Sequence, residues 1–164
     1  MPKAVFLYDC TSVAGRPWEI GGYECYYFDA KREGDEHLLV NPLDITSSVK
    51  RVRAAVGGSA HIVVGFPPCT DLASSGARHW ARKREADPLF QYKAMQLFNF
   101  VAAVGYSLGA RWAIENPVGY PSNDWGKPDF TFDPCDYGGY LPEDDVHPTH
   151  PRYFPPGIVT GKQN

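Results

Sequence analysis

A cysteine and a glutamate, each placed after a short apolar run, are the residues of this chain best suited to carry chemistry. Cys69 follows two prolines, which stiffen its backbone and give its thiol a rigid base. Glu115 follows the apolar residues 112–114 and precedes an Asn-Pro pair. A thiol held in this way can act as a nucleophile, and a carboxyl group in the same cleft can share or deliver a proton. The two residues together predict a catalytic site.

Each of the two residues also has a structural interpretation. A lone cysteine is often a small buried hydrophobe, and the position of Cys69 supports that role and the nucleophilic role equally. A carboxylate at a strand end is commonly paired with a cation, and nearby arginines could serve as partners of Glu115. Finding a thiol and a carboxyl group at two strand ends favours a site over two unrelated structural roles.

The elements that must position these residues are short strands alternating with helices. Apolar runs predict strands at residues 4–8, 24–28, 38–40, 61–65 and 111–114. Helices are predicted at about 17–20, from a cap at Thr46 to about 56, and over the amphipathic segment 88–108. The segment 74–87 is polar and basic, and we expect it to form a loop.

This alternation predicts an α/β fold with a mostly parallel sheet, because a helix between two parallel strands makes a right-handed crossover. Ligands of such sheets bind beyond the carboxyl ends of the strands, near the point where the strand order reverses. The predicted strand ends carry Tyr8 and Asp9, Asp29, Cys69, and Glu115. Chemistry is therefore expected at one edge of the sheet.

Length and composition predict a single soluble domain. A chain of 164 residues with 43% hydrophobic residues suits one sizeable core, with a loop-rich part after residue 119. The net charge of -3 excludes a uniformly basic coat, so any nucleic acid must bind at a local site. The four cysteines form no CxxC pair, and His147 and His150 lie among prolines, so no metal site is predicted. No run approaches the roughly 20 apolar residues of a membrane span, and we expect a cytoplasmic protein with no membrane partner.

The order of strand, Pro-Pro-Cys, long helix, strand and Glu-Asn-Pro resembles that of the DNA cytosine-C5 methyltransferases. Within that family the chain is most similar to short methyltransferase-like proteins of bacteriophages, on the strength of residues 66–73 and 132–139. The resemblance implies a Rossmann-like fold that uses S-adenosylmethionine as cofactor, DNA as partner, and the cytoplasm of a bacterial host cell as location.

The resemblance also implies a mechanism. The thiolate of Cys69 would add to C6 of a cytosine while Glu115 donates a hydrogen bond or proton at N3, and C5 would then take a methyl group from the cofactor. A base in a duplex would first have to flip out of the helix. On the substrate side stand Pro68, Arg78 and Asn116. Asn116 would brace the Glu115 loop, and Arg78 would contact a phosphate or the base, although Arg78 could equally be a solvated surface charge.

The family places a Phe-x-Gly-x-Gly turn after its first strand, where the glycines let the backbone approach the cofactor. In this chain Cys10 and Ser12 replace both glycines. The resemblance further implies that Asp29 binds the ribose hydroxyls and Asp44 the adenine amino group, although each could instead cap the turn or helix that follows it. The implied cofactor residues are therefore Tyr8, Asp9, Thr11, Ser12, Asp29 and Asp44.

Other departures from the family keep two further interpretations open. Thr70 and Ala73 replace the usual Gln and Ser after the cysteine. The 49 residues after Glu115 leave no room for a target-recognition domain, so we expect a truncated or minimal form, with a possible protein partner supplying sequence recognition. One alternative is a catalytically idle module that binds nucleic acid or a partner. The other is an enzyme that makes a different pyrimidine modification.

Overall fold

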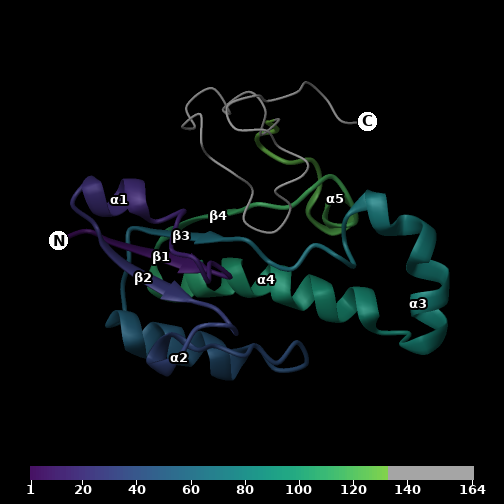
Figure 1. Ribbon diagram of the computed structural model, residues 1–164, viewed down its shortest axis with the longest axis horizontal. Coiled ribbons are helices and arrows are strands. Elements are labelled where there is room, and N and C mark those ends of the chain that lie inside the picture. Colours follow the sequence, from purple (N-terminus) through teal and green to yellow (C-terminus); the bar gives the residue numbers. More distant parts are fainter. Residues whose placement is uncertain (133–164) are drawn as a thin grey trace. The chain divides into compact units, whose positions relative to one another are not determined.

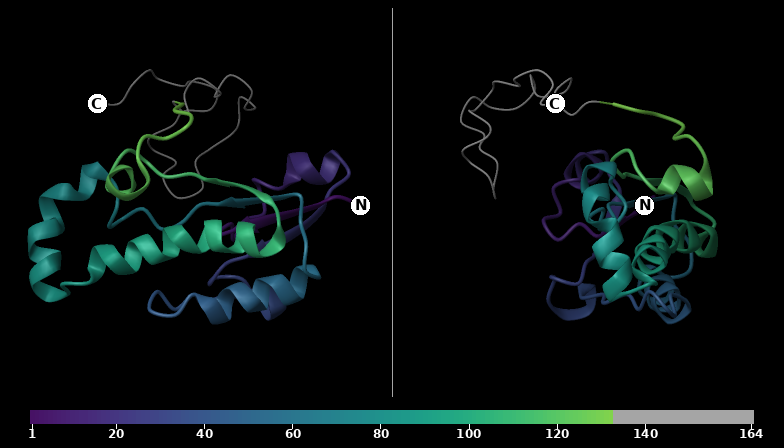
Figure 2. Two further views of the ribbon diagram at one scale, coloured as in Figure 1. Left: turned by 180° about the vertical axis from the view of Figure 1, so that it is seen from behind. Right: turned by 90° about the vertical axis from the view of Figure 1, so that its right-hand side faces the viewer.

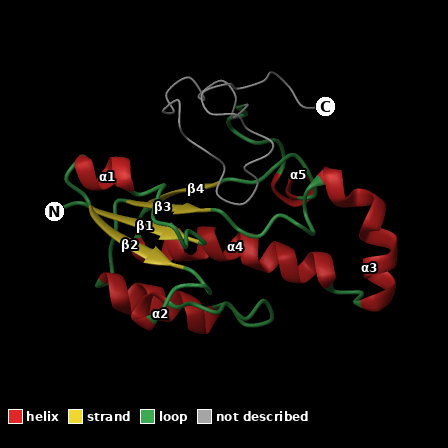
Figure 3. Cartoon of the chain, in the orientation of Figure 1, coloured by secondary structure: helices red, strands yellow, loops and turns green. Residues whose placement is uncertain are grey.

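Four short strands pair side by side and run in the same direction. The computed structural model describes residues 1–132, in which β1 (Lys3–Leu7), β2 (Glu24–Phe28), β3 (Ile62–Gly65) and β4 (Arg111–Ile114) form a sheet of order β2-β1-β3-β4. All three pairings are parallel, and the arrows of Figure 3 point the same way. The predicted α/β class is confirmed, and the strand order agrees with a Rossmann-like topology.

Helices cover both faces of this sheet. The short helix α1 (Arg16–Ile20) lies on one face, while α2 (Thr46–Val56) and the long α4 (Phe90–Leu108) lie on the other (Figures 1 and 2). The step from β1 to β2 runs opposite to the step from β3 to β4, so right-handed crossovers must place α1 and α4 on opposite faces. The remaining helical segments are η1 (Gly34–Glu36), η2 (Ser74–His79), α3 (Trp80–Ala86) and α5 (Pro121–Trp125).

The core follows the alternation of side chains along β1. Val5 and Leu7 point to the face that packs against Val52 of α2 and Val101 of α4. Ala4 and Phe6 point to the other face, where Phe6 contacts the ring of Trp18 from α1. Residues 4–7 are at most 1% exposed, because a central strand with helices on both faces is apolar along its whole length.

The register brings the carboxyl ends of three strands to one level. Leu7 of β1 pairs with Gly65 of β3, and Gly65 pairs with Ile114 of β4. The chains leaving β1 and β3 turn in opposite directions, so the strand order reverses between these two neighbours. The residues that follow β1, β3 and β4 therefore share one edge of the sheet.

Residues 38–40 were expected to form a strand, and that prediction is wrong. Within residues 1–132, a single parallel bridge, between Asp29 and His37, continues the sheet beyond β2. Leu38 and Val40 are nonetheless buried, at 4% and 8% exposure. The apolar character of this run comes from core packing in irregular backbone, which periodicity cannot distinguish from a short strand.

Two further local predictions need correction. Thr46 is the first residue of α2 and not its cap, because the N-cap position belongs to Ile45 and the capping acceptor is Asp44. The polar segment 74–87 is not a loop, because η2 and α3 occupy most of it. Basic residues have good helix propensity, and Pro88 then separates α3 from α4.

None of the helices within residues 1–132 has both the length and the apolar character needed to cross a bilayer. Residues 127–132 carry no helix or strand. The segment 132–139 that supports the family resemblance, apart from Phe132, and the residues His147 and His150 lie outside the described residues.

Candidate active site

The loop that carries Cys69 turns back on itself directly after β3. Pro67 is buried and Pro68 is exposed, while Cys69 is half-buried. The carbonyl oxygen of Cys69 accepts hydrogen bonds from the backbone N–H groups of Leu72 at 2.9 Å and Ala73 at 2.8 Å. These bonds close a tight turn in which Cys69 is the first residue.

The Cys69 loop and the loop after Glu115 are joined backbone to backbone. Ala73 and Gly119 form an antiparallel bridge, the N–H of Ser74 donates to the carbonyl of Val118 at 2.9 Å, and the N–H of Tyr120 donates to that of Leu72 at 2.8 Å. A Cβ atom on Gly119 would lie 2.0 Å from the Leu72 oxygen, so this approach requires glycine. The two loops that sequence reasoning selected therefore lie side by side.

Glu115 follows β4 directly, and its N–H donates to the carbonyl of Gly65 at 3.0 Å. The residue is exposed overall, yet the protein around its carboxyl group removes enough water to raise the pKa of Glu115 above the usual range for glutamate. Within residues 1–132 no side chain forms an ion pair or hydrogen bond with this carboxyl group. The arginine partner considered from the sequence is thus not found among the described residues.

Asn116 is half-buried and folds its amide back onto its own loop. Its Nδ2 donates to the carbonyl of Pro117 at 2.7 Å, whereas its buried Oδ1 has no hydrogen-bond partner within the described residues. Arg78 lies on η2 and is exposed, and its Nε donates to Nε2 of His79 at 3.0 Å. Arg78 thus remains close in sequence to Cys69 and free of any carboxylate among residues 1–132.

The turn after β1 adopts a backbone conformation typical of glycine without containing one. Tyr8 and Ser12 have φ angles of 63° and 61°, in the left-handed region that side chains disfavour. Asp9 holds the turn, because its Oδ1 accepts bonds from the N–H groups of Thr11 at 3.1 Å and Ser12 at 2.9 Å. Ser12 occupies a position where the family has glycine, and the backbone there keeps the glycine-like shape.

Asp9 is also the most notable polar residue of the turn, because it is only 7% exposed. While Oδ1 accepts three bonds, the third from Oγ1 of Thr11 at 2.9 Å, the buried Oδ2 has no partner within the described residues. A buried carboxylate oxygen without a donor is costly, so it marks a place where a hydrogen-bond donor would be stabilising.

Tyr8 joins the end of β1 to the long helix. Its hydroxyl donates to the carbonyl of Leu97 at 3.0 Å, and its ring meets that of Phe100 edge-on at 6.2 Å. Burial, and to a lesser degree the charge of Asp29, raises the pKa of Tyr8 above its usual value, so the hydroxyl stays protonated. The Tyr8 side chain therefore connects the end of β1 to α4 through a hydrogen bond and a ring contact.

The two other acidic residues of the expected cofactor side act as caps in this structure. Asp29 is half-buried, and its Oδ1 accepts the N–H of Lys31 at 2.7 Å. Asp44 is exposed, with Oδ1 accepting the N–H of Thr46 and Oδ2 the hydroxyl of Ser47, both at 3.1 Å. Both carboxylates hold local backbone, and each retains lone pairs for a further donor.

Sequence reasoning did not select Arg32, which ties the turns after β1 and β2 together. Its Nη1 donates to Oγ of Ser12 at 2.8 Å and to the carbonyl of Cys10 at 3.2 Å, and its Nη2 pairs with Glu36 at 2.6 Å. It also lies over the ring of Tyr27, 5.3 Å from the ring centre. An arginine in a polar stretch gives no sign of such contacts, so no signal in the sequence could have identified it.

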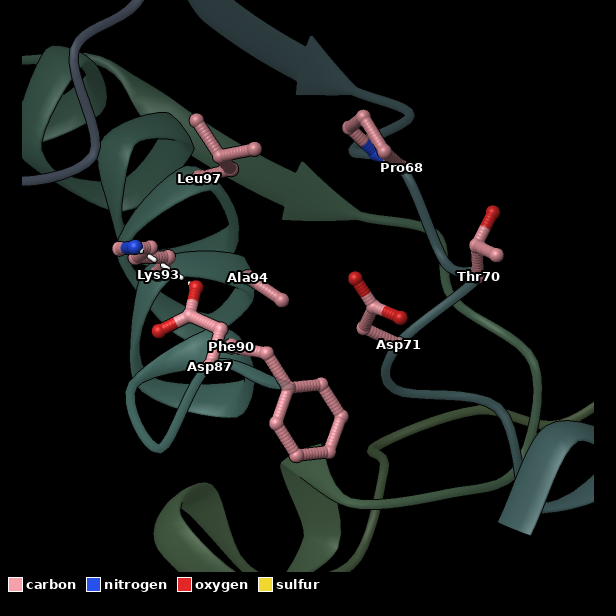
Figure 4. Close-up of a pocket in the computed structure, with 8 residues that line it drawn as sticks. All are labelled: Pro68, Thr70, Asp71, Asp87, Phe90, Lys93, Ala94 and Leu97. Carbon is pink, nitrogen blue, oxygen red and sulfur yellow. Dashed lines mark hydrogen bonds and ion pairs between the residues drawn. The ribbon is translucent and has the colours of Figure 1, made fainter. Parts of the chain in front are cut away.

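A cavity of about 180 Å³ lies between the Cys69 loop and the first half of α4 (Figure 4). Pro68, Thr70 and Asp71 line it from the loop, and in Figure 4 the Asp71 carboxyl group extends toward α4. On the opposite side Lys93 pairs with Asp87 at 2.7 Å. A second cavity of about 460 Å³ lies along β2, with Leu38 and Arg51 among its lining residues. Cys69 and Glu115 line neither of these two cavities.

Comparison of the chain with protein-family models, curated proteins and solved structures found no match. Within residues 1–132, no group of three or more His, Cys, Asp or Glu side chains could hold a metal ion. The resemblance to the cytosine-C5 methyltransferases therefore rests on the residues of the sequence motifs alone.

Proposed function

We propose that this protein is a cytosine-C5 DNA methyltransferase-like enzyme, in which Cys69 adds to C6 of the pyrimidine and S-adenosylmethionine provides the methyl group for C5. One observation carries the proposal. The loop of Cys69 and the loop after Glu115 are hydrogen-bonded to each other at the carboxyl end of a parallel sheet. That edge is where α/β sheets of this topology bind ligands and carry out chemistry.

The two side chains have complementary tasks. The thiolate of Cys69 forms a bond to C6 while the C5–C6 double bond opens, and the released electron pair makes C5 nucleophilic. After C5 takes the methyl group, it loses its proton to a base or water, and the electron pair of that C–H bond restores the double bond and expels the Cys69 thiolate. Glu115 stabilises the electron density released by the thiolate addition by delivering a hydrogen bond or proton at N3. The raised pKa of Glu115 supports this role, because its carboxyl group keeps a proton to higher pH than an ordinary glutamate does.

Substrate contacts would come from the same two loops. Pro68 and Asn116 flank the reacting residues, and Arg78 follows on η2 with no carboxylate partner among the described residues. DNA would bind at this local site, since the net charge of -3 provides no general attraction for phosphates. A protein partner would supply sequence recognition, and we expect the protein to act in the cytoplasm of a bacterial host cell.

The turn after β1 fits the proposed cofactor in its hydrogen-bonding chemistry. S-adenosylmethionine presents an ammonium group, ribose hydroxyls and an adenine amino group, all of which are donors. The unpartnered Oδ2 of Asp9 is a buried acceptor suited to such a donor. Supporting residues would be Tyr8, Thr11 and Ser12 in the same turn, with Asp29 and Asp44 in the turns that follow. When bound, the cofactor supplies an electrophilic methyl group. With S-adenosylmethionine assigned to this turn, the proposed fold type is that of the S-adenosylmethionine-dependent methyltransferases.

The proposal is tested by trapping the covalent intermediate. DNA containing 5-fluorocytosine is incubated with the protein and S-adenosylmethionine, and adducts are resolved on denaturing gels. The wild-type protein should form an adduct, and Cys69→Ser should form none. Cys25→Ser is the matched control, because this half-buried thiol lies on β2 away from the two loops, and it should trap as the wild type does. Equal trapping by the wild type and Cys69→Ser contradicts the assignment.

A binding module without turnover is the second candidate, and the cofactor turn favours it. Cys10 and Ser12 replace the two glycines that the cytosine-C5 methyltransferases have in this turn. Arg32 donates hydrogen bonds to the carbonyl of Cys10 and to the hydroxyl of Ser12. If these contacts block the cofactor, calorimetry should detect no heat of binding when S-adenosylmethionine is titrated into the protein. Tight binding would exclude this candidate.

A further inference from the structure

One side chain outside the Cys69 loop reaches into it. The ammonium group of Lys83 on α3 forms an ion pair and hydrogen bond with Oδ1 of Asp71, which lies two positions after Cys69. The two side chains are 33% and 35% exposed, so the pair is half-buried. Within residues 1–132, Lys83 makes the only hydrogen bond or ion pair to a side chain of residues 67–71.

The backbone pairing with the Glu115 loop does not extend to Asp71, although the Cys69 carbonyl accepts two backbone bonds within its own turn. The pairing with the Glu115 loop involves Leu72, Ala73 and Ser74, which lie beyond the turn that Cys69 begins. Asp71 lies between the nucleophile and that pairing, on the wall of the 180 Å³ cavity. The ion pair with Lys83 is therefore the side-chain contact that adds to these backbone bonds in restraining the loop on the side of Cys69.

The helix that supplies Lys83 is itself anchored at both ends. Trp80, its first residue, meets the ring of Tyr120 edge-on at 6.2 Å, and Tyr120 belongs to the segment after Glu115. Near the other end, Nη2 of Arg84 donates to Oε1 of the buried Gln91 on α4 at 2.9 Å. The Lys83 ammonium thus comes from a supported element, which is a condition for holding another group in place.

We propose that Lys83 is a positioning residue for Cys69, acting through Asp71. This inference rests on the proposed function. By fixing Asp71, Lys83 restricts the loop so that the thiol approaches C6 of the base from one direction. Loss of the pair lets the loop relax, and small displacements of a reacting group slow covalent addition even when the substrate still binds.

The test is a double-mutant cycle measured at the chemical step. The rate of adduct formation with 5-fluorocytosine DNA is followed under single-turnover conditions, and DNA affinity is measured separately by fluorescence anisotropy. Lys83→Met and Asp71→Asn should each lower the rate about tenfold while DNA affinity is kept. The double variant should be no slower than either single one, because both remove the same interaction. Lys83→Arg, which preserves the charge, should restore most of the rate.

The pair formed by Asp87 and Lys93 supplies the matched control. Its side chains are 39% and 36% exposed, and it borders the same cavity, but among the described residues it forms no hydrogen bond or ion pair with the loop of Cys69. Lys93→Met should therefore trap at the wild-type rate. Thermal melting of every variant reports whether it is folded.

Each other outcome overturns the inference in a recognisable way. A wild-type rate in Asp71→Asn shows that the pair does not position the thiol. Weaker DNA binding by Lys83→Met with an unchanged rate at saturating DNA means that Lys83 contacts phosphate instead. An equal loss of rate in Lys93→Met would mean that a change in the cavity, and not the loss of the Lys83–Asp71 pair, slows adduct formation. A wild-type protein that traps no DNA overturns the proposed function, and this inference falls with it.

Discussion

At the scale of single residues, the site combines groups whose environments are costly for stability. Oδ2 of Asp9 is buried without a donor among the described residues, and the carboxyl group of Glu115 is partly desolvated without a cation among them. Tyr8 and Ser12 hold left-handed backbone conformations. Such costs collect where a protein binds or transforms a ligand, because those tasks require unpaired groups and fixed geometry.

Glu115→Gln should lower activity and raise stability. Because the folded state raises the pKa of Glu115, ionisation of this group destabilises the fold as pH rises through that pKa. The glutamine variant should therefore melt slightly higher than the wild type at neutral pH and equally at a pH below the unfolded value of about 4.3. Its adduct formation should fall about 10²-fold, because glutamine cannot deliver a proton.

The control for this variant is Glu33→Gln, since Glu33 is exposed and its side chain makes no capping hydrogen bond. Glu33→Gln should change neither the melting temperature nor the rate of adduct formation. A Glu115→Gln variant that is less stable than the wild type at neutral pH would show that its carboxylate has a stabilising partner.

The left-handed conformation of Ser12 can be tested by comparing two substitutions. Ser12→Gly and Ser12→Ala both remove the hydroxyl that accepts from Arg32, but only glycine relieves the backbone strain at a φ of 61°. Ser12→Gly should be more stable than Ser12→Ala by about 1 kcal/mol in urea denaturation. Equal stability would mean that the strain is absent in solution.

At the scale of elements, the site depends on a contact between two loops and on the helix next to them. Gly119 allows the backbone of one loop to approach that of the other, and α3 holds the first loop through Asp71. The sheet alone places the ends of β3 and β4 at one level, whereas these contacts decide how the loops are shaped beyond those ends.

Gly119→Ala should separate the two loops. The added methyl group would lie 2.0 Å from the carbonyl oxygen of Leu72, and backbone atoms cannot move away as a flexible side chain can. We expect a loss of about 1–3 kcal/mol in the free energy of unfolding and a loss of adduct formation with 5-fluorocytosine DNA. Val118→Ala, at a neighbouring residue that is 75% exposed, should leave both unchanged. An active Gly119→Ala protein would show that the pairing is not needed.

At the scale of the whole molecule, the sheet and the long helix behave as two layers in direct contact. A Cβ atom on Gly65 of β3 would lie 2.4 Å from Cγ2 of Val101, so glycine lets α4 approach the strand that leads to Cys69. Val101 is fully buried in the main core. Glycine at position 65 thus lets the helix pack closely against β3 beneath the candidate site.

A double substitution can test this close packing. Gly65→Ala should lower the free energy of unfolding by about 1–3 kcal/mol through overpacking. Val101→Ala alone should cost about 2 kcal/mol through the space it leaves. Because the added methyl group would occupy part of that space, the double variant should lose less than the sum of the two. Purely additive losses, measured by urea denaturation, would contradict the contact.

The sequence by itself predicted the class of fold, which the structure confirms, and selected Cys69 and Glu115 as candidate reactive residues. The runs at 24–28, 61–65 and 111–114 lie within or beside strands, and α2 and α4 lie within one or two residues of their predicted bounds. Prolines, caps and helical periodicity are local properties, so they can be identified without knowing what packs against what. Glu115 was selected because it directly follows the run 111–114, and Cys69 because it follows the run 61–65 after a pair of prolines.

Only the tertiary structure decided how the loops after β3 and β4 are joined to each other and to the helix beside them. Residues 38–40 became irregular chain in which Leu38 and Val40 are buried, and the segment 74–87 became mostly helical, because each depended on its packing partners. The approach at Gly119, the unpartnered oxygen of Asp9 and the pair of Lys83 with Asp71 all involve residues brought together by the fold. Such contacts leave no periodic trace along the chain, because they depend on where two distant segments meet and not on the residues beside either one.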